Sequence, residues 1–435
     1  MLGVFLLLGA GLWAAQPTPA KAPWPELREQ TFQEVWQTVN DAYFDATYGG
    51  VDWAEMRAKY HARLEQANDN EELRALLRAM LGELHRTHFA ILPRAAAVFT
   101  PKERDRIGTL GAEFAYSDGK VVVTKVEPGS AAEHAALKPG DVVSKVDGVD
   151  LAALSKELAA ADMPDARREF HLVNYVKSHA QMAVGSEVHL AIEAKAGQAE
   201  ERALKTVAHN GAWSEPMGSF PSFPLGFSAE HRADHIGYLT FNVFVPEFAK
   251  RTRVFLRQLQ SGDGLIVDLR GNPGGNSILA PAICGWLTQT EFSLGVMHLR
   301  QGQISFDVSP QEGAFTGPVA VLIDATSAST SEIFAAGLQE TKRARIFGET
   351  SAGAALPSTF KTLPTGDIFQ YAVADVTTPG GQLIEGRGVM PDEKVTRQAA
   401  DLAAGVDPVV EAARAWIDRE RGAAAPAATA APHSP

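Results

Sequence analysis

The stretch GLIVDLRGNPGG occupies residues 264–275 and joins two opposite kinds of sequence. Its first half is a run of Leu, Ile and Val with little interruption, which is typical of a strand buried on both faces. Its second half predicts a turn, because glycines and a proline follow one another closely. Gly274 and Gly275 would let the backbone approach a ligand and offer N–H groups to it, although an ordinary turn uses the same residues.

Strands and helices alternate on both sides of this stretch. Apolar strands are predicted at 236–241 and 319–324, and helices at 247–259, 278–287 and 331–339. Alternation of this kind indicates a mixed α/β sheet covered by helices.

A candidate catalytic segment joins the strand 319–324 to the helix 331–339. Its sequence is DATSASTSE, residues 324–332. A hydroxyl at such a junction lies near the positive end of the helix dipole, which favours a developing oxyanion. Ser329 followed three residues later by Glu332 also matches a capping box, which needs no chemistry. Spacing alone leaves both interpretations open.

The first half of the chain divides into a helical part and a β-rich part. Helices are predicted at 26–40, 53–64 and 71–84, and their aromatic residues are expected in a core. From 108 to 207, β-branched runs alternate with tight turns around a longer helical segment, 151–182.

Two further side chains can act together with a serine. His88 follows Thr87 after the third predicted helix, and an imidazole can serve as general base toward a hydroxyl. Glu385 can orient such a histidine. A structural histidine and a surface ion pair between Glu385 and Arg387 are the simpler alternatives. His85 and His88 could share a metal ion, but no third ligand stands near them in sequence, so neither metal nor cofactor is expected.

Charge and cysteine content exclude several classes of protein. The formal net charge of −12 argues against nucleic acid as a partner, because phosphate binding needs clustered Lys and Arg. Cys284 is the only cysteine, so no disulfide within the chain and no cysteine-based zinc site can form. It lies in an apolar run and is expected to be a small buried side chain.

Both ends of the chain differ in composition from the rest. Residues Met1 to Ala15 are almost wholly apolar and too short for a typical membrane span. They are typical of the hydrophobic part of a signal peptide, although the usual positive residues before it are missing. We therefore expect a periplasmic or secreted protein. The tail 422–435 is rich in Ala and Pro and is expected to be disordered.

Taken together, these segments resemble the family of C-terminal processing peptidases, tricorn-core peptidases and retinoid-binding-protein repeats, over about residues 31–395. The resemblance rests on 264–275, on the serine segment 326–335 and on GETSAG at 348–353. It also includes TLGAEF at 109–114, which is similar to the carboxylate-binding loop of a PDZ domain. The family's fold is multidomain α+β, with an N-terminal helical module, a PDZ-like β domain and a mixed α/β core of the ClpP/crotonase-like type.

The resemblance implies a division of the chain. This is a signal-like segment (1–15), a linker (16–25), an N-terminal helical domain (26–95), a PDZ-like domain (96–210), a serine peptidase core (211–421) and the disordered tail (422–435).

The same resemblance implies roles for individual residues. Ser329 is the nucleophile, and the oxyanion hole is formed by the amide of Thr330 with that of Gly274 or Gly275. A peptide C-terminus is bound by strand addition at the PDZ-like domain. The residues expected to hold it are Leu110, Gly111, Ala112 and Phe114.

One position departs from the processing peptidases. They carry a lysine base shortly after the Gly-Glu-Thr segment, where this chain has Ala354. Tricorn-like members use a histidine that follows a Ser or Thr, assisted by a downstream glutamate. By that resemblance His88 is the base, Thr87 a supporting hydroxyl and Glu385 the orienting group. A lysine such as Lys361 stays the alternative base.

Three functions are compatible with this pattern. The first is an active serine endopeptidase acting on proteins or peptides with accessible C-termini. The others are a non-catalytic ligand-binding protein on the same scaffold and a PDZ peptide-binding adaptor. The joint presence of Ser329, His88 and Glu385 favours the peptidase. A regulatory partner is compatible with the sequence, which leaves the oligomeric state open.

Overall fold

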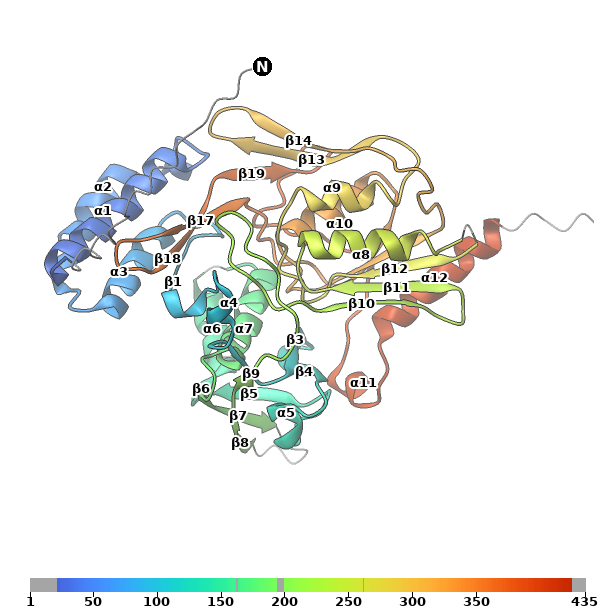
Figure 1. The fold of residues 1–435 in the computed structure, drawn as a ribbon, viewed down its shortest axis with the longest axis horizontal. Helices are drawn as coiled ribbons and strands as arrows, with labels where there is room; N and C mark the ends of the chain where they lie inside the picture. The colour runs from blue at the N-terminus through green and yellow to red at the C-terminus, as the bar shows by residue number, and fades with distance from the viewer. Residues whose placement is uncertain (1–21, 162, 194–198, 261, 425–435) are drawn as a thin grey trace, which may run out of the picture.

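A six-stranded sheet lies at the centre of the C-terminal half of the chain, and the stretch 264–275 supplies one of its inner strands (Figure 1). The computed structural model describes residues 22–161, 163–193, 199–260 and 262–424. The strand order is β10-β11-β12-β15-β16-β20, and every neighbouring pair is parallel except the β10–β11 hairpin. The strands are β10 (Phe227–His231), β11 (Ile236–Phe241), β12 (Gly264–Asp268), β15 (Val319–Ile323), β16 (Arg345–Gly348) and β20 (Glu393–Lys394).

Helices cover both faces of this sheet, which explains why β12 is apolar along its length. Leu265 and Val267 pack into the core on one face, together with residues of three helices. Ile266 packs into the core on the other face, beneath a single long helix. The helices are α8 (Pro246–Leu256), α9 (Leu279–Cys284) and α10 (Thr330–Glu340) on the first face and α12 (Pro408–Ala424) on the second.

The predicted N-terminal helices form, and they share their core with a later part of the chain. They are α1 (Trp24–Ala42), α2 (Trp53–His61) and α3 (Asn70–Gly82). Leu356, Leu363 and Phe369 belong to the same buried cluster as Phe32 and Leu77. A short strand after α3 extends this contact into a three-stranded sheet. Its order is β1 (Ala90–Leu92), β18 (Ile368–Ala372) and β17 (Ser358–Thr362).

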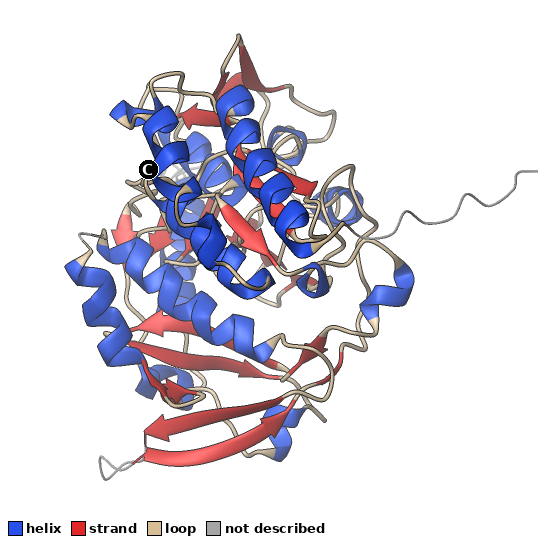
Figure 2. Ribbon diagram, turned by 90° about the vertical axis from the view of Figure 1, so that its left-hand side faces the viewer, coloured by secondary structure: helices blue, strands red, loops and turns tan. Residues whose placement is uncertain are grey.

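The β-rich part is a separate sheet with its own core. Its strand order is β3-β4-β5-β7-β8, with β6 paired to β5, and a short β2–β9 pair lies beside it. Figure 2 shows helices between this sheet, at the bottom of the view, and the remainder of the molecule. The strands are β2 (Gly108–Thr109), β3 (Ala112–Ser117), β4 (Lys120–Val126), β5 (Val142–Val146), β6 (Val149–Asp150), β7 (Glu187–Glu193), β8 (Ala199–Lys205) and β9 (Val207–Ala208).

The helical segment predicted at 151–182 is two helices. They are α6 (Leu151–Ala160) and α7 (Asp165–Ala180), and α7 begins directly after Pro164. A proline has no backbone N–H to continue the helix before it, so the chain starts a new helix there. Helix α7 packs beside the edge strand β3.

The remaining elements are small. A second three-stranded sheet has the order β14 (Gln303–Val308), β13 (Phe292–Leu299) and β19 (Ala374–Thr377). The short helices are α4 (Pro101–Arg104), α5 (Ala131–His134) and α11 (Ala399–Ala403).

Two predicted boundaries were wrong by a few residues. Helix α1 begins at Trp24, inside the predicted linker 16–25, because Trp24 packs against the N-terminal core and Pro25 is tolerated in a first helical turn. Helix α12 runs to Ala424, past the predicted start of the tail at 422, since Ala favours helix. The predicted signal segment 1–15 lies outside the described residues. Within the described ranges no helix is long and apolar enough to cross a membrane.

Candidate active site

Ser329 has an unusual backbone conformation at the junction between β15 and α10. Its φ is 54° and its ψ is −117°, a region that non-glycine residues rarely occupy. Its N–H donates to the carbonyl oxygen of Ala354 at 2.8 Å and to Oε2 of Glu332 at 3.0 Å. The hydrogen bonds to Ala354 and Glu332 therefore hold this backbone conformation.

Ser329 is also the only residue of the segment 319–338 that is not buried. Its neighbours Ser327 and Ser331 are fully buried, and their hydroxyls have structural partners. The Ser327 hydroxyl donates to the carbonyl oxygen of Leu269 at 2.8 Å, and that of Ser331 to Asn272 at 3.0 Å. Of these three serines, Ser329 is the one that a substrate can reach.

Glu332 organises the loop around Ser329. Its buried carboxylate accepts hydrogen bonds from the Ser351 hydroxyl and from the N–H groups of Gly353, Ala354 and Ser329, at 2.5 to 3.0 Å. Burial raises the pKa of Glu332 to about 7. The capping interpretation of Ser329 and Glu332 is thus right for the carboxylate, which joins the helix start to the 351–354 loop.

The glycine turn approaches the serine closely. A Cβ atom on Gly274 would lie 2.7 Å from Cβ of Ser329 and 2.8 Å from the nitrogen of Thr330, so only glycine fits there. The Gly274 N–H donates to Oδ1 of Asn272 at 2.9 Å. Among the described residues no acceptor is found for the N–H of Gly275 or of Thr330. Of the two predicted glycine amides, Gly275 is therefore the better candidate for the oxyanion hole.

Thr87 connects His88 to Glu385. Oγ1 of Thr87 lies 2.8 Å from Nδ1 of His88 and 2.8 Å from Oε2 of Glu385, and the Thr87 N–H donates to Oε1 of Glu385 at 2.9 Å. An ionised carboxylate can only accept, so the single hydroxyl proton of Thr87 is donated to Glu385. Oγ1 then accepts from Nδ1–H of His88, which assigns the lone pair of the neutral imidazole to Nε2.

The two groups of residues meet at the segment 354–355. The carbonyl oxygen of Ala354 accepts from Ser329, and the N–H of Ala355 donates to Oε2 of Glu385 at 3.0 Å. A chain of hydrogen bonds through the segment 354–355 therefore links Ser329 to Glu385 and, through it, to residues 87–88. Residues 87–88 and 385 lie far from the serine segment in sequence. The segment 354–355 therefore lies between the predicted nucleophile and Glu385 of the predicted base network.

Helix α7 of the PDZ-like domain contacts this region. Phe170 packs against Ala328, Ala352 and Ala354, which surround the serine. Arg167 is close enough for its charge to act on both His88 and Glu385. Burial, with a smaller contribution from Arg167, lowers the pKa of His88 to about 4. Sequence reasoning missed both α7 residues, because no local pattern indicates a contact between distant segments.

Two lysines that follow the serine segment in sequence and could replace His88 as the base, Lys361 and Lys342, have other surroundings. Lys361 forms an ion pair with Glu34 of α1 and a hydrogen bond with Thr38. Lys342 is exposed after the end of α10. The position of the family's lysine, Ala354, is a buried contact of Phe170.

The predicted carboxylate-binding loop is already engaged within its own domain. The N–H of Leu110 donates to the carbonyl oxygen of Ala180 at 3.0 Å, and that of Gly111 to Oγ1 of Thr109 at 2.9 Å. Leu110 and Phe114 are buried in the core of the domain, and Ala112 begins the edge strand β3. To bind the N–H groups of Leu110 and Gly111, a peptide C-terminus would have to replace both of these hydrogen bonds.

Three family models match the chain. The model described as peptidase family S41 matches residues 235–395, the tricorn protease C1 domain matches 25–82, and the PDZ domain matches 98–173. The PDZ-like fold of the β-rich part is thereby confirmed.

Curated relatives cover most of the chain. A carboxyl-terminal-processing protease of Synechocystis is 28% identical over 98% of this chain and 93% of its own length. A chloroplastic carboxyl-terminal-processing peptidase 2 of Arabidopsis thaliana is 26% identical over 84% of this chain and 68% of its own length.

Solved structures share the fold. The photosystem II D1 C-terminal processing protease has a TM-score of 0.58 at 22% identity and covers 85% of this chain and 93% of its own. Mature CPAF has a TM-score of 0.62 at 16% identity over 91% of this chain and 97% of its own. The domain matches and the relatives agree with one another: the chain carries a peptidase family S41 domain over residues 235–395 together with tricorn C1 and PDZ domains, and it is similar to carboxyl-terminal-processing proteases.

Proposed function

We propose that Ser329 is the nucleophile of a serine endopeptidase with His88 as general base. The observation that carries this proposal is the segment 354–355, which is hydrogen-bonded on one side to Ser329 and on the other to Glu385. Nε2 of His88 takes the proton of the Ser329 hydroxyl as Oγ attacks the scissile carbonyl. Thr87 and Glu385 hold the imidazole in the tautomer that this step needs.

The negative charge of the tetrahedral intermediate falls on the former carbonyl oxygen. The amides of Gly275 and Thr330 are the donors proposed to stabilise it, and both lie at the mouth of the glycine turn. His88 then returns its proton to the leaving amine, and water releases the acyl group from Ser329 by the same steps in reverse.

The assignment of Ser329 is tested by comparing neighbouring serines. Ser329→Ala is expected to abolish hydrolysis of an unfolded protein while circular dichroism and the thermal midpoint stay unchanged. Ser327→Ala and Ser331→Ala are matched controls that lose two and one buried hydrogen bonds respectively, each worth about 1 kcal/mol, and are expected to keep activity. Normal turnover in Ser329→Ala would refute the assignment.

We further propose that the substrates are proteins or peptides presented by their C-terminal tails. The relatives are named as processing C-termini, and a PDZ domain binds peptide ends by strand addition. Isothermal titration of the Ser329→Ala chain with an apolar peptide and with its C-terminal amide tests this. Tighter binding of the free carboxylate is expected, whereas equal affinities would exclude recognition of the tail by its charge.

Export to the periplasm or out of the cell is also a proposal, resting on the apolar residues 1–15. Fractionation of cells producing the full chain, with N-terminal sequencing of the mature protein, tests it. A cytoplasmic protein that retains residues 1–15 would overturn it.

A further inference from the structure

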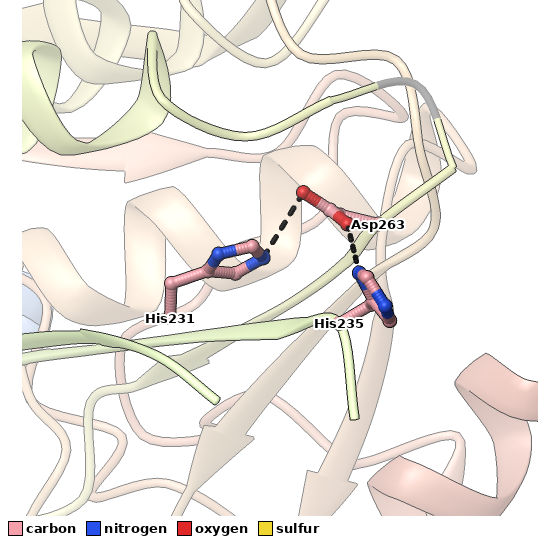
Figure 3. A group of neighbouring side chains, drawn as sticks. All are labelled: His231, His235 and Asp263. Carbon is pink, nitrogen blue, oxygen red and sulfur yellow. Dashed lines mark ion pairs between the residues drawn. The ribbon is translucent and has the colours of Figure 1, made fainter. Parts of the chain in front are cut away.

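Two histidines and one aspartate meet at the end of the sheet opposite the proposed active site. His231 ends β10, His235 lies in the turn before β11, and Asp263 directly precedes β12 (Figure 3). Strands β11, β12 and β15 are parallel, and Ser329 and the glycine turn follow the carboxyl ends of β15 and β12. The cluster lies at the amino ends of β11 and β12, so it does not belong to the catalytic machinery.

The three side chains converge on a common point. Nε2 of His231 lies 3.1 Å from Oδ2 of Asp263, and Nδ1 of His235 lies 3.5 Å from Oδ1. One donor atom from each residue lies within 4.8 Å of the other two. A tetrahedral ion with ligands at about 2.0–2.2 Å holds its donor atoms about 3.4 Å apart. Each imidazole nitrogen lies at about this spacing from one of the two Asp263 oxygens, and binding of one ion needs only that the exposed imidazoles turn toward a shared oxygen.

The backbone around the cluster is fixed by hydrogen bonds. The N–H of Gly264 donates to the carbonyl oxygen of His235 at 3.0 Å, which ties the turn to the start of β12. The N–H of Gln260 donates to Oδ2 of Asp263 at 2.8 Å and orients the carboxylate. His235 has a φ of 62°, a conformation that costs free energy in a non-glycine residue. The backbone of the turn and the carboxylate of Asp263 are thus positioned before any ion binds.

The aspartate of the cluster is buried, whereas the two histidines are exposed. The side chain of Asp263 is 4% exposed, whereas those of His231 and His235 are 40% and 69% exposed. Within the described residues no Lys or Arg nitrogen lies within 4.0 Å of the Asp263 carboxylate. A buried carboxylate needs a countercharge. An imidazole provides one only when it is protonated, whereas a metal ion provides one and leaves both imidazoles neutral.

We propose that His231, His235 and Asp263 bind one divalent transition-metal ion of the zinc type, which fastens the β10–β11 turn to the start of β12. Two imidazoles and one carboxylate suit Zn²⁺, while Mg²⁺ and Ca²⁺ prefer oxygen ligands alone. Three protein ligands leave a fourth position for water. The neighbouring Asp234 does not compete for the ion, because it pairs with Arg414 of α12 at 2.7 Å.

Calorimetric titration tests the site. The untagged full chain is treated with EDTA, dialysed, and titrated with ZnCl₂ and separately with MgCl₂, while the thermal midpoint is followed at each metal concentration. One Zn²⁺ per chain is expected to bind and raise the midpoint, with no response to Mg²⁺. His231→Ala and His235→Ala are each expected to weaken binding by more than the roughly 10–100-fold loss that an outer-shell partner causes.

A matched control is available in the PDZ domain. His189 is also exposed and lies 3.0 Å from one carboxylate, that of Glu187, and among the residues that the structure describes this pair belongs to no group of three possible metal ligands. His189→Ala is expected to leave zinc binding unchanged. The proposal is overturned if the wild-type chain binds no stoichiometric Zn²⁺, or if the His231 and His235 variants bind it as tightly as the wild type does.

Discussion

At the scale of single residues, the account depends on His88. A lysine base would have to lose its proton in a buried site, whereas a histidine kept neutral by burial is ready to accept one. His88→Ala is expected to lower kcat at least about 10³-fold, as loss of a triad base does. Glu385→Gln is expected to lower it less, because Glu385 acts through Thr87. Steady-state kinetics on a peptide substrate measures both.

The matched control for His88 is the alternative base. Lys361 is paired with Glu34 on the outside of α1, so Lys361→Ala is expected to keep near-normal rates. An inactive Lys361→Ala together with an active His88→Ala would mean a rearranged Ser/Lys peptidase.

The pKa of His88 has a consequence for pH. Burial lowers it to about 4, so the imidazole of the resting chain stays neutral well below the ordinary histidine pKa of about 6.5. Between these values the unfolded chain binds a proton that the folded chain does not, so His88 makes folding stability fall as the pH falls from about 6.5 to 4.

Histidine NMR titration of the Ser329→Ala chain measures this directly, with the His88 signal assigned by its loss in His88→Gln. Arg167→Gln is expected to move the titration upward, because it removes a positive charge. A midpoint near pH 6.5 in both chains would contradict a desolvated His88 imidazole in the resting protein.

At the scale of elements, the glycine turn after β12 and the start of α10 function as one unit. Gly274 has a φ of 101°, and a methyl group there would overlap Ser329 and Thr330. Gly274→Ala is therefore expected to displace the nucleophile and lower kcat by roughly 100-fold, the cost of about 1 Å of misplacement. Kinetics and thermal unfolding of the variant check this.

A substitution at Gly119 separates the cost of a positive φ from the cost of steric overlap. It also has a positive φ, 82°, but a methyl group there would meet nothing within 4 Å. Gly119→Ala is expected to lose about 1–2 kcal/mol of stability from its conformation alone and to keep full activity. Equal activities of the Gly274 and Gly119 variants would show that close approach to Ser329 is unimportant.

How much of the fold is predictable also differs between elements. The strand β12 and the serine segment are encoded locally, because an apolar run and a glycine turn each specify their own structure. The break between α6 and α7 was signalled by Pro164, but the helical pattern on both sides concealed it. The pairing of β1 with β18 depends on residues far apart in the chain, and so do the contacts of Arg167 and Phe170. The His231, His235 and Asp263 cluster was missed for the same reason, since Asp263 comes from a different strand connection.

At the scale of the whole molecule, the PDZ domain rests on the proposed active site through α7. Glu169, next to Phe170, faces Glu349 and Asp165 as well as the positive charges of Arg168 and Lys394. Burial, assisted by Glu349, raises the pKa of Glu169 to about 7. While the PDZ domain is docked, the Glu169 carboxyl keeps a proton that the same carboxyl releases at lower pH when the domain is undocked. The contribution of Glu169 to docking is therefore full below about pH 4.5 and is lost as the pH rises from there to about 7.

With undocking taken as the step that opens the surroundings of Ser329, this linkage predicts a rise in peptidase activity as the pH rises from about 4.5 to about 7. Glu169→Gln keeps the size of the side chain without its charge and is expected to flatten that rise. Measuring kcat/KM across this range in both chains checks the prediction. A rise of the same size in Glu169→Gln would place its origin elsewhere.

Ser329 is proposed to be a nucleophile activated by the network of His88, Thr87 and Glu385. The most direct measurement is labelling of the folded chain with a fluorophosphonate, followed by mass spectrometry of the peptides. A single adduct on Ser329 is expected, with labelling strongly slowed in His88→Ala and unchanged in Lys361→Ala. An adduct on another residue, or labelling of Ser329 at the same rate in His88→Ala, would contradict it.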